Sequence, residues 1–215
     1  MREWQVWAAA AAALLWILAL GLTRRTWQRN GRSMLRDQID RDVNQLRDTP
    51  EGIARRMADA PGDPVAAIKH ARLAEAAQDW PEALARGRLV ARLFPRLQHG
   101  PMIVAHALWN DGAHGEARRM TNRLRRRFPE DWQTLEFSIV QARSFQEWPL
   151  VVRLGRRMRR RFAAAAAGYG YEAEGLIALG RLEAAGRALR RAELAFPGNA
   201  EIAKLWQTLA EVPVD

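Results

Sequence analysis

Apolar residues recur at the spacing of one helix face through most of this chain, and four of the segments with this pattern end at a phenylalanine. Phe94, Phe128, Phe162 and Phe196 are 34 residues apart each time. A fixed period of this size is typical of stacked helix-turn-helix units, none of which can bury its apolar face alone. The pattern therefore predicts an all-α protein built as a solenoid of helical hairpins.

Prolines and short turns set the expected helix boundaries. A proline at the first position of a helix costs no hydrogen bond, and pairs such as Asp63-Pro64 and Trp148-Pro149 fit that position. First helices are expected at 64–77, 101–110, 131–143 and 166–179, and second helices at 81–93, 114–127, 148–161 and 182–195. These helices define repeats at 64–97, 98–131, 132–165 and 166–199, within a domain of residues 63–215. A last helix at 199–211 would cap the open end of the stack.

The N-terminal segment has a different pattern. Residues Trp4 to Leu22 are uncharged at all 19 positions. As a helix they would be roughly 28 Å long, close to the ~30 Å hydrocarbon core of a bilayer. We therefore expect a transmembrane anchor at residues 1–23. A cleaved signal peptide is the alternative, and it fits less well because Arg24 and Arg25 follow the apolar run directly.

The charges beside this segment predict its orientation. Arg24, Arg25, Arg29, Arg32 and Arg36 follow it, whereas little positive charge precedes it. The positive-inside rule then predicts a single-pass protein of the bacterial inner membrane with its C-terminal domain in the cytoplasm. A periplasmic domain is the alternative.

Residues 24–62 are expected to form a basic juxtamembrane segment followed by degenerate capping helices. Leu35, Ile39 and Val43 make one apolar stripe, and Thr49-Pro50 is typical of a helix start. Pro61 lies 34 residues before Pro95, in phase with the later repeats. A charged stalk with some helix is the alternative.

Small residues, prolines and glycines recur at fixed positions of the repeat. They are Ala71, Ala105 and Ala173 in the first helices, Ala83, Ala117 and Ala185 in the second, Pro95, Pro129 and Pro197 after them, and Gly112 and Gly180 in the turns. With these residues the chain resembles the tetratricopeptide repeat (TPR) family, in a membrane-anchored bacterial form. The resemblance covers residues 63–197 and is poorest in the third unit, where Ile139 replaces a small residue. Gln78 and Gln146 also depart from the glycine of the inter-helix turn.

The resemblance implies a right-handed α-solenoid whose first helices line a concave groove. Such proteins are mainly partner-binding scaffolds without catalysis. Trp109, Met102 and Arg143 are the strongest candidate anchors, because aromatic and arginine side chains carry most interface energy. The alternative is that several candidates are solvent-facing or pack within the stack. The complete set of candidate partner-binding residues is Arg72, Met102, His106, Trp109, Glu136, Arg143 and Glu174.

The charge balance adds a second candidate surface. The chain has 34 basic and 24 acidic residues, and arginines crowd the C-terminal turns of the second helices. Favourable interaction with the helix dipole accounts for one or two cations per helix end, not for five. We expect a basic patch facing anionic membrane lipid, with a solvated face as the alternative. Nucleic acid fits less well, because no aromatic residues interleave with the arginines. The patch residues are Arg24, Arg25, Arg126, Arg157, Arg160 and Arg161.

Residues for catalysis, cofactors or metals are not arranged in any expected pattern. His99 and His106 would lie about 10 Å apart along one helix, too far for a shared metal ion. The prediction is a membrane-anchored scaffold or adaptor, not an enzyme, that binds a protein partner in its groove. The alternatives are a periplasm-facing component of an envelope or polysaccharide-secretion assembly, and a membrane-tethered nucleic-acid binder.

Overall fold

The computed structural model describes residues 38–39, 41–43 and 49–212, and every regular element in these ranges is helical. The chain divides into two compact units, with the boundary between Leu73 and Ala74. All-α architecture is thus confirmed. The helices are α2 (Pro50–Asp59), α3 (Pro64–Ala76), α4 (Trp80–Leu93), α5 (His99–Asn110), α6 (His114–Arg127), α7 (Trp132–Ser144), α8 (Trp148–Arg161), α9 (Ala167–Ala178), α10 (Leu182–Ala195) and α11 (Ala200–Glu211).

The first unit contains α2 and most of α3, which runs across the boundary. The Thr49 side chain caps α2 by accepting a hydrogen bond from the backbone of Gly52, as its position before Pro50 indicates. Asp63 serves both helices, because it accepts a hydrogen bond from the Val65 backbone and forms an ion pair with Arg56 at 3.1 Å. The degenerate repeat predicted within residues 24–62 stays a prediction.

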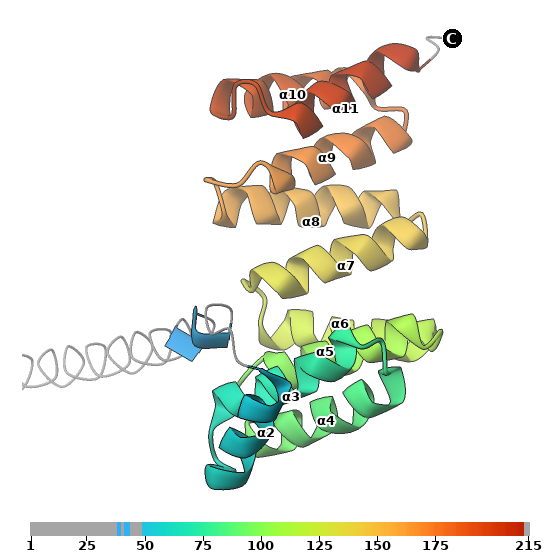
Figure 1. Cartoon of the computed structure of the whole chain (residues 1–215). Coiled ribbons are helices and arrows are strands. Elements are labelled where there is room, and N and C mark those ends of the chain that lie inside the picture. Colours follow the sequence, from blue (N-terminus) through green and yellow to red (C-terminus); the bar gives the residue numbers. More distant parts are fainter. Residues whose placement is uncertain (1–37, 40, 44–48, 213–215) are drawn as a thin grey trace, which may run out of the picture. The chain divides into compact units, whose positions relative to one another are not determined.

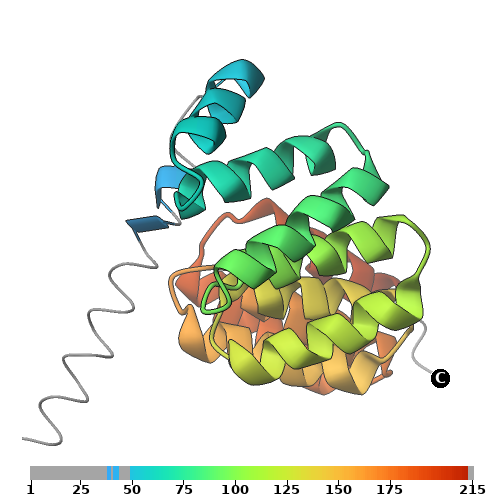
Figure 2. The same cartoon turned by 90° about the horizontal axis from the view of Figure 1, so that it is seen from below.

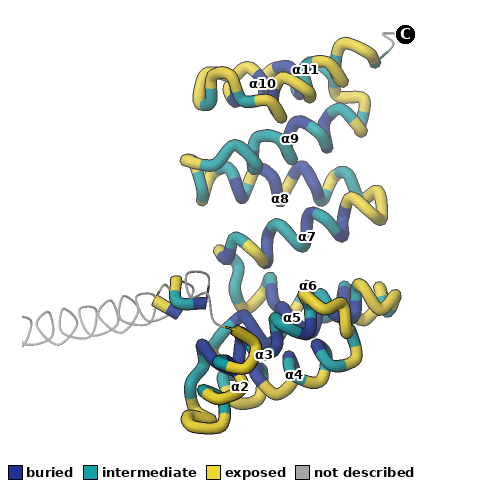
Figure 3. The backbone as a smooth tube through the Cα atoms, viewed as in Figure 1, coloured by how far each residue is buried: buried dark blue, intermediate teal, exposed yellow. Residues whose placement is uncertain are grey.

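The second unit is a stack of helical hairpins. In Figure 1, α7 to α11 follow one another along the stack, and Figure 2 looks along it so that the later helices lie behind α4 to α6. Figure 3 shows that buried residues concentrate on the inner helices, whereas α11 is mostly exposed and fully buries only Ile202. The last helix therefore caps the stack with one apolar side.

The 34-residue period of phenylalanines marks helix ends. Phe94, Phe128, Phe162 and Phe196 are the C-cap residues of the four second helices. Each donates its backbone N–H to the carbonyl four residues earlier, for example Phe94 to Val90 at 2.8 Å. Their rings are only half-buried, and two of them pack edge-on against the first helix of their own hairpin, Phe162 against Trp132 and Phe196 against Tyr169.

The turns within the hairpins also repeat one conformation. Gly112 and Gly180 have positive φ, and so do Gln78 at 58° and Gln146 at 55°. The two glutamines, which looked like departures in the sequence, therefore occupy the same left-handed turn position as the two glycines. A residue with a β-carbon is strained there by roughly 1–2 kcal/mol, and the stack accepts that cost twice.

Four leucines, one on each second helix, differ in burial. Leu124, Leu154 and Leu189 are almost fully buried, but Leu89 is 39% exposed and contributes little to the core. Ile139, which replaces a small residue in the third repeat, is completely buried in a cluster with Leu135 and Met158.

Two kinds of junction join successive helical hairpins of the stack. Gly100 packs directly on the α4 backbone, where an added β-carbon would lie 2.3 Å from the Ala91 nitrogen. Gly168, 68 residues later, does the same on α8, with a distance of 2.4 Å to the Arg159 nitrogen. At the intervening junction of α6 and α7 the equivalent residue is Thr134. Close backbone approach therefore alternates along the stack.

The predicted localisation in the bacterial inner membrane requires correction. Within the described residues, no helix has both the length and the apolar character needed to cross a membrane. The segment Trp4 to Leu22, on which that localisation and the predicted anchor at 1–23 depended, lies outside the described residues.

Candidate partner-binding surface

Side chains on consecutive first helices of the second unit contact one another in a continuous series. Glu75, at the end of α3, forms an ion pair with His106 on α5 at 3.5 Å between Oε1 and Nδ1. The His106 ring packs edge-on against Phe137 on α7 at 4.2 Å. Farther along, Arg143 on α7 pairs with Glu174 on α9 at 2.7 Å. We call these residues, together with the aromatic cluster around Trp109 and the charged cluster around Glu136 described next, the first-helix ladder.

An aromatic cluster forms one half of the ladder. The Trp109 ring lies 4.4 Å from His114, 6.2 Å from Phe137 and 5.8 Å from Phe145. Phe145 is 41% exposed, and the Arg118 guanidinium lies 5.1 Å from its ring centroid. Clustered aromatic side chains at a partly exposed surface are among those that most often anchor a binding partner.

A charged cluster forms the other half. Arg143 and Glu174 leave 44% and 26% of their side chains exposed, so the pair is open to solvent. Trp132 donates its indole N–H to Glu136 at 3.1 Å, across one turn of α7. Burial raises the pKa of Tyr171, and the charge of Glu136 raises it further, while Arg143 opposes both. Tyr171 is thus neutral at physiological pH and can donate a hydrogen bond.

The ladder includes His106, Trp109, Glu136, Arg143 and Glu174 of the predicted binding residues. Met102 is not accessible. It is 3% exposed and packs with Ala105 and Leu124 in the core, because helices α6 and α7 cover the first turns of α5. Arg72 lies on α3 in the first unit and is described apart from the ladder.

Sequence reasoning missed Phe137, Phe145 and Glu172. Phe137 falls between the positions assigned to the groove, and Phe145 is the C-cap residue of α7, where an ordinary turn was expected. Glu172 is 2% exposed and pairs with Arg156 and Arg159 at 2.9 Å and with Arg191 at 3.7 Å. No arginine lies between Arg161 and Arg181 in the sequence, so nothing local to Glu172 indicated these ion pairs.

Arginines of the second helices form a separate surface. Arg161 pairs with Glu130 at 3.2 Å, whereas Arg157 and Arg160 line a hollow beside α8. Arg126, on α6, is exposed. Arg24 and Arg25, the other members of the predicted lipid-facing patch, lie outside the described residues. The lipid contact itself stays a prediction.

Metal-ligating side chains form no cluster in the part of the chain that the structure describes. No group of three or more His, Asp and Glu side chains there could hold a metal ion. His99 is 2% exposed, and the ladder holds His106 between Glu75 and Phe137. The two imidazoles, expected about 10 Å apart along one helix, therefore have separate surroundings.

Comparison with known proteins supports the fold. No family model matches the chain, and no curated protein matches it either. Among solved structures, it is similar to TTC0263, a thermophilic TPR protein in Thermus thermophilus, with TM-score 0.55 and 16% identity over 76% of this chain and 89% of that one. It is also similar to MamA (MSR-1, C2), with TM-score 0.50 and 18% identity over 67% of this chain and 83% of that one. The fold is TPR-like.

Proposed function

We propose that this chain is a scaffold that binds a protein partner along the first-helix ladder. The observation that carries the proposal is the partly exposed aromatic cluster of Trp109, Phe137 and Phe145, next to the open Arg143–Glu174 pair. Aromatic rings and arginine are the side chains most enriched among interface residues that dominate binding energy.

The ladder also has the form that a peptide or helix needs. Its contacts run across α5, α7 and α9, so a partner lying along it would meet apolar rings first and paired charges next. This mixture favours an amphipathic segment with apolar side chains at one end and a charged side chain at the other. The TPR-like fold supports the same function at the level of architecture.

Photo-crosslinking with the full chain tests the proposal. A crosslinking residue placed at Phe145 is expected to trap one partner in cells, and Arg143→Ala is expected to reduce its yield about tenfold, the effect of one interface anchor. Arg187→Ala is the matched control, because Arg187 is an ion-paired, 59% exposed arginine on α10. The proposal fails if both arginine variants reduce the yield equally, or if crosslinks at Phe145 are no more specific than those at an exposed site on α10.

A further inference from the structure

The second helices carry a hollow whose positive charge is not neutralised. It has a volume of about 330 Å³ and lies between α6 and α8. Leu150 and Leu154 give it apolar walls. Four arginines line the rest: Arg125, Arg153, Arg157 and Arg160. We call this the α6/α8 arginine hollow.

The acids near this hollow are already bound to other arginines. Glu147 pairs with Arg118, and Glu130 pairs with Arg161. None of the four hollow arginines forms an ion pair within the described residues, and the polar contact of Arg125 is with the neutral side chain of Asn122 at 2.9 Å. Burial, followed by the charges of neighbouring arginines, lowers the pKa of Arg125. The hollow therefore concentrates cations that an anionic ligand would stabilise.

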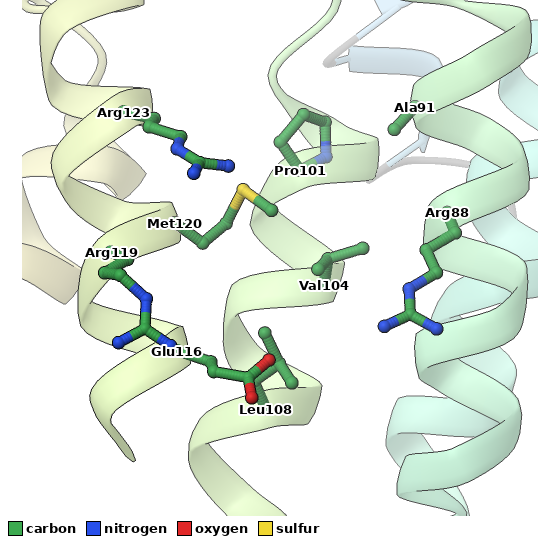
Figure 4. Close-up of a pocket in the computed structure, with 9 residues that line it drawn as sticks. All are labelled: Arg88, Ala91, Pro101, Val104, Leu108, Glu116, Arg119, Met120 and Arg123. Carbon is green, nitrogen blue, oxygen red and sulfur yellow. The ribbon is translucent and has the colours of Figure 1, made fainter. Parts of the chain in front are cut away.

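Similar hollows flank this one. On the other side of α8, a hollow of about 380 Å³ shares Arg153 and Arg160 and adds Arg156 and Arg181, beside the apolar Val152 and Leu179. A third, of about 320 Å³, lies between α4 and α6, where α5 forms its floor. In Figure 4, Arg88 from α4 faces Arg119 and Arg123 from α6 across Val104 and Leu108. Each hollow thus combines guanidinium groups with apolar side chains, although Glu116 also lines the third hollow and Arg156 of the second already pairs with Glu172.

The arginines recur with the period of the repeat. Positions 34 residues apart carry arginine three times in each of three series: Arg119, Arg153 and Arg187; Arg123, Arg157 and Arg191; Arg92, Arg126 and Arg160. A stack of equivalent second helices places such residues in rows that cross from one unit to the next. An extended anionic chain running across the second helices would meet a cation at each unit.

The lining of the hollows favours a polypeptide over other polyanions. No aromatic ring lines any of the three, so the bases of a nucleic acid would find nothing to stack on. A bilayer surface is flat on the scale of one helix, so its headgroups would reach the outer arginines but leave the apolar walls uncovered. Carboxylates match the guanidinium fork, and leucine or valine side chains match the walls.

We infer that these three hollows form a second docking surface, which takes an extended acidic segment of a protein partner with interspersed apolar side chains. Its carboxylates pair with the hollow arginines, and its apolar side chains rest on residues such as Leu150 and Leu154. This surface is separate from the first-helix ladder and does not depend on the proposed function.

Fluorescence anisotropy with the full chain and a labelled synthetic peptide of alternating glutamate and leucine residues tests the inference. Arg153→Glu combined with Arg157→Glu is expected to weaken binding at least about tenfold, because two cation contacts become repulsive. Affinity for the unaltered chain should fall as salt is added. Circular dichroism checks that the variant is folded, and Arg153→Gln with Arg157→Gln provides a milder form.

Arg55→Glu combined with Arg96→Glu is the matched control. Both residues are exposed arginines that line none of the three hollows, and the pair changes the net charge equally. The control should bind within about twofold of the unaltered chain, a difference too small to indicate a lost contact. A Trp109→Ala variant should also bind normally, which separates this surface from the ladder.

Three results would overturn the inference. If the hollow and control variants weaken peptide binding equally, the effect comes from net charge alone. If a peptide with glutamine in place of glutamate binds equally well, carboxylates are not required for binding. Preferential binding of phosphatidylserine vesicles or of a single-stranded oligonucleotide, lost only in the hollow variants, would assign the surface to lipid or nucleic acid.

Discussion

Two junctions in the stack bring neighbouring helices together in different ways. At the α8/α9 junction, the backbone of Gly168 packs against the backbone of Arg159, so no side chain separates the helices. At the α6/α7 junction, the equivalent residue Thr134 has a side chain, which donates a hydrogen bond to Asp131 at 2.8 Å. One junction brings two backbones into contact, whereas at the other the equivalent residue has a side chain that hydrogen-bonds within its own helix.

The comparison extends to a second pair of positions. Gly155 on α8 has Thr121 as its equivalent on α6, and the Thr121 hydroxyl donates to the Ala117 carbonyl at 3.0 Å. An added β-carbon on Gly155 would lie 2.6 Å from the Glu172 nitrogen. Hence the α8/α9 junction needs glycine on both helices, whereas α6/α7 has threonine on both. Equal repeat length along the chain does not mean equal contact between units.

The largest expected effect comes from removing close approach at the glycine junction. Gly168→Ala should destabilise the chain by about 3 kcal/mol, because the new methyl group meets rigid backbone and the helices must separate. Gly170→Ala, two residues along the same helix, meets only the Leu205 side chain at 3.7 Å and should be neutral or slightly stabilising. Urea denaturation followed by circular dichroism compares the two. Similar midpoints for both variants would mean that the helices are not in direct contact.

The next effect concerns the buried charge at the same junction. Glu172→Gln should cost about 2 kcal/mol, since the three arginines around it lose their carboxylate; their partial exposure keeps the cost below that of a fully buried pair. Glu174→Gln, which affects only the open pair with Arg143, should cost less than about 1 kcal/mol. Denaturation midpoints measure both. Equal losses of stability in the two variants would show that the ion pairs of Glu172 do not stabilise the packing of α9 against α8 and α10.

A smaller effect is expected at the threonine junction. Asp131 is 5% exposed and caps α7 by accepting from the Thr134 backbone at 2.8 Å as well as from its hydroxyl. Asp131→Ala should therefore cost about 1.5 kcal/mol, near the upper part of the range for an N-cap. Asp79→Ala, which removes an exposed cap with one bond of 3.1 Å, should cost about half as much. If thermal melts show a larger loss for Asp79→Ala than for Asp131→Ala, Asp131 stabilises the fold no more than an ordinary cap does.

Much of this architecture could be predicted from the sequence, because helix ends are local events. Proline at a helix start and phenylalanine at a C-cap depend on neighbours a few residues away, and the observed boundaries of α4, α6, α8 and α10 agree with expectation to within one residue. The junctions could not be predicted in this way. The roles of Gly155 and Gly168 appear only when two distant helices meet, and a glycine in a helix is otherwise a weak signal.

The candidate surface was predictable to a smaller extent. Helical periodicity placed Met102, His106 and Trp109 on one stripe of α5, and the contacts of His106 and Trp109 agree with that placement. Met102 lies one turn earlier, where Leu124 and Phe128 from the second helix of the same hairpin cover α5. Periodicity gives the direction of a side chain but not how far a neighbouring helix extends over it.

The smallest expected effect concerns the electrostatic interaction between Tyr171 on α9 and Glu136 on α7. The backbone of Tyr171 lies at the glycine junction, and its pKa is raised by burial and then by Glu136 on α7. A Tyr169→Phe chain leaves Tyr171 as the only tyrosine, and its absorbance should titrate above the ordinary value of about 10. Because the folded state keeps the proton longer than the unfolded state, this contribution to stability is complete below about pH 10 and is lost as the pH rises through the folded pKa. Adding Glu136→Gln should move the titration back towards the ordinary value; no movement would mean that Tyr171 does not link α9 to α7.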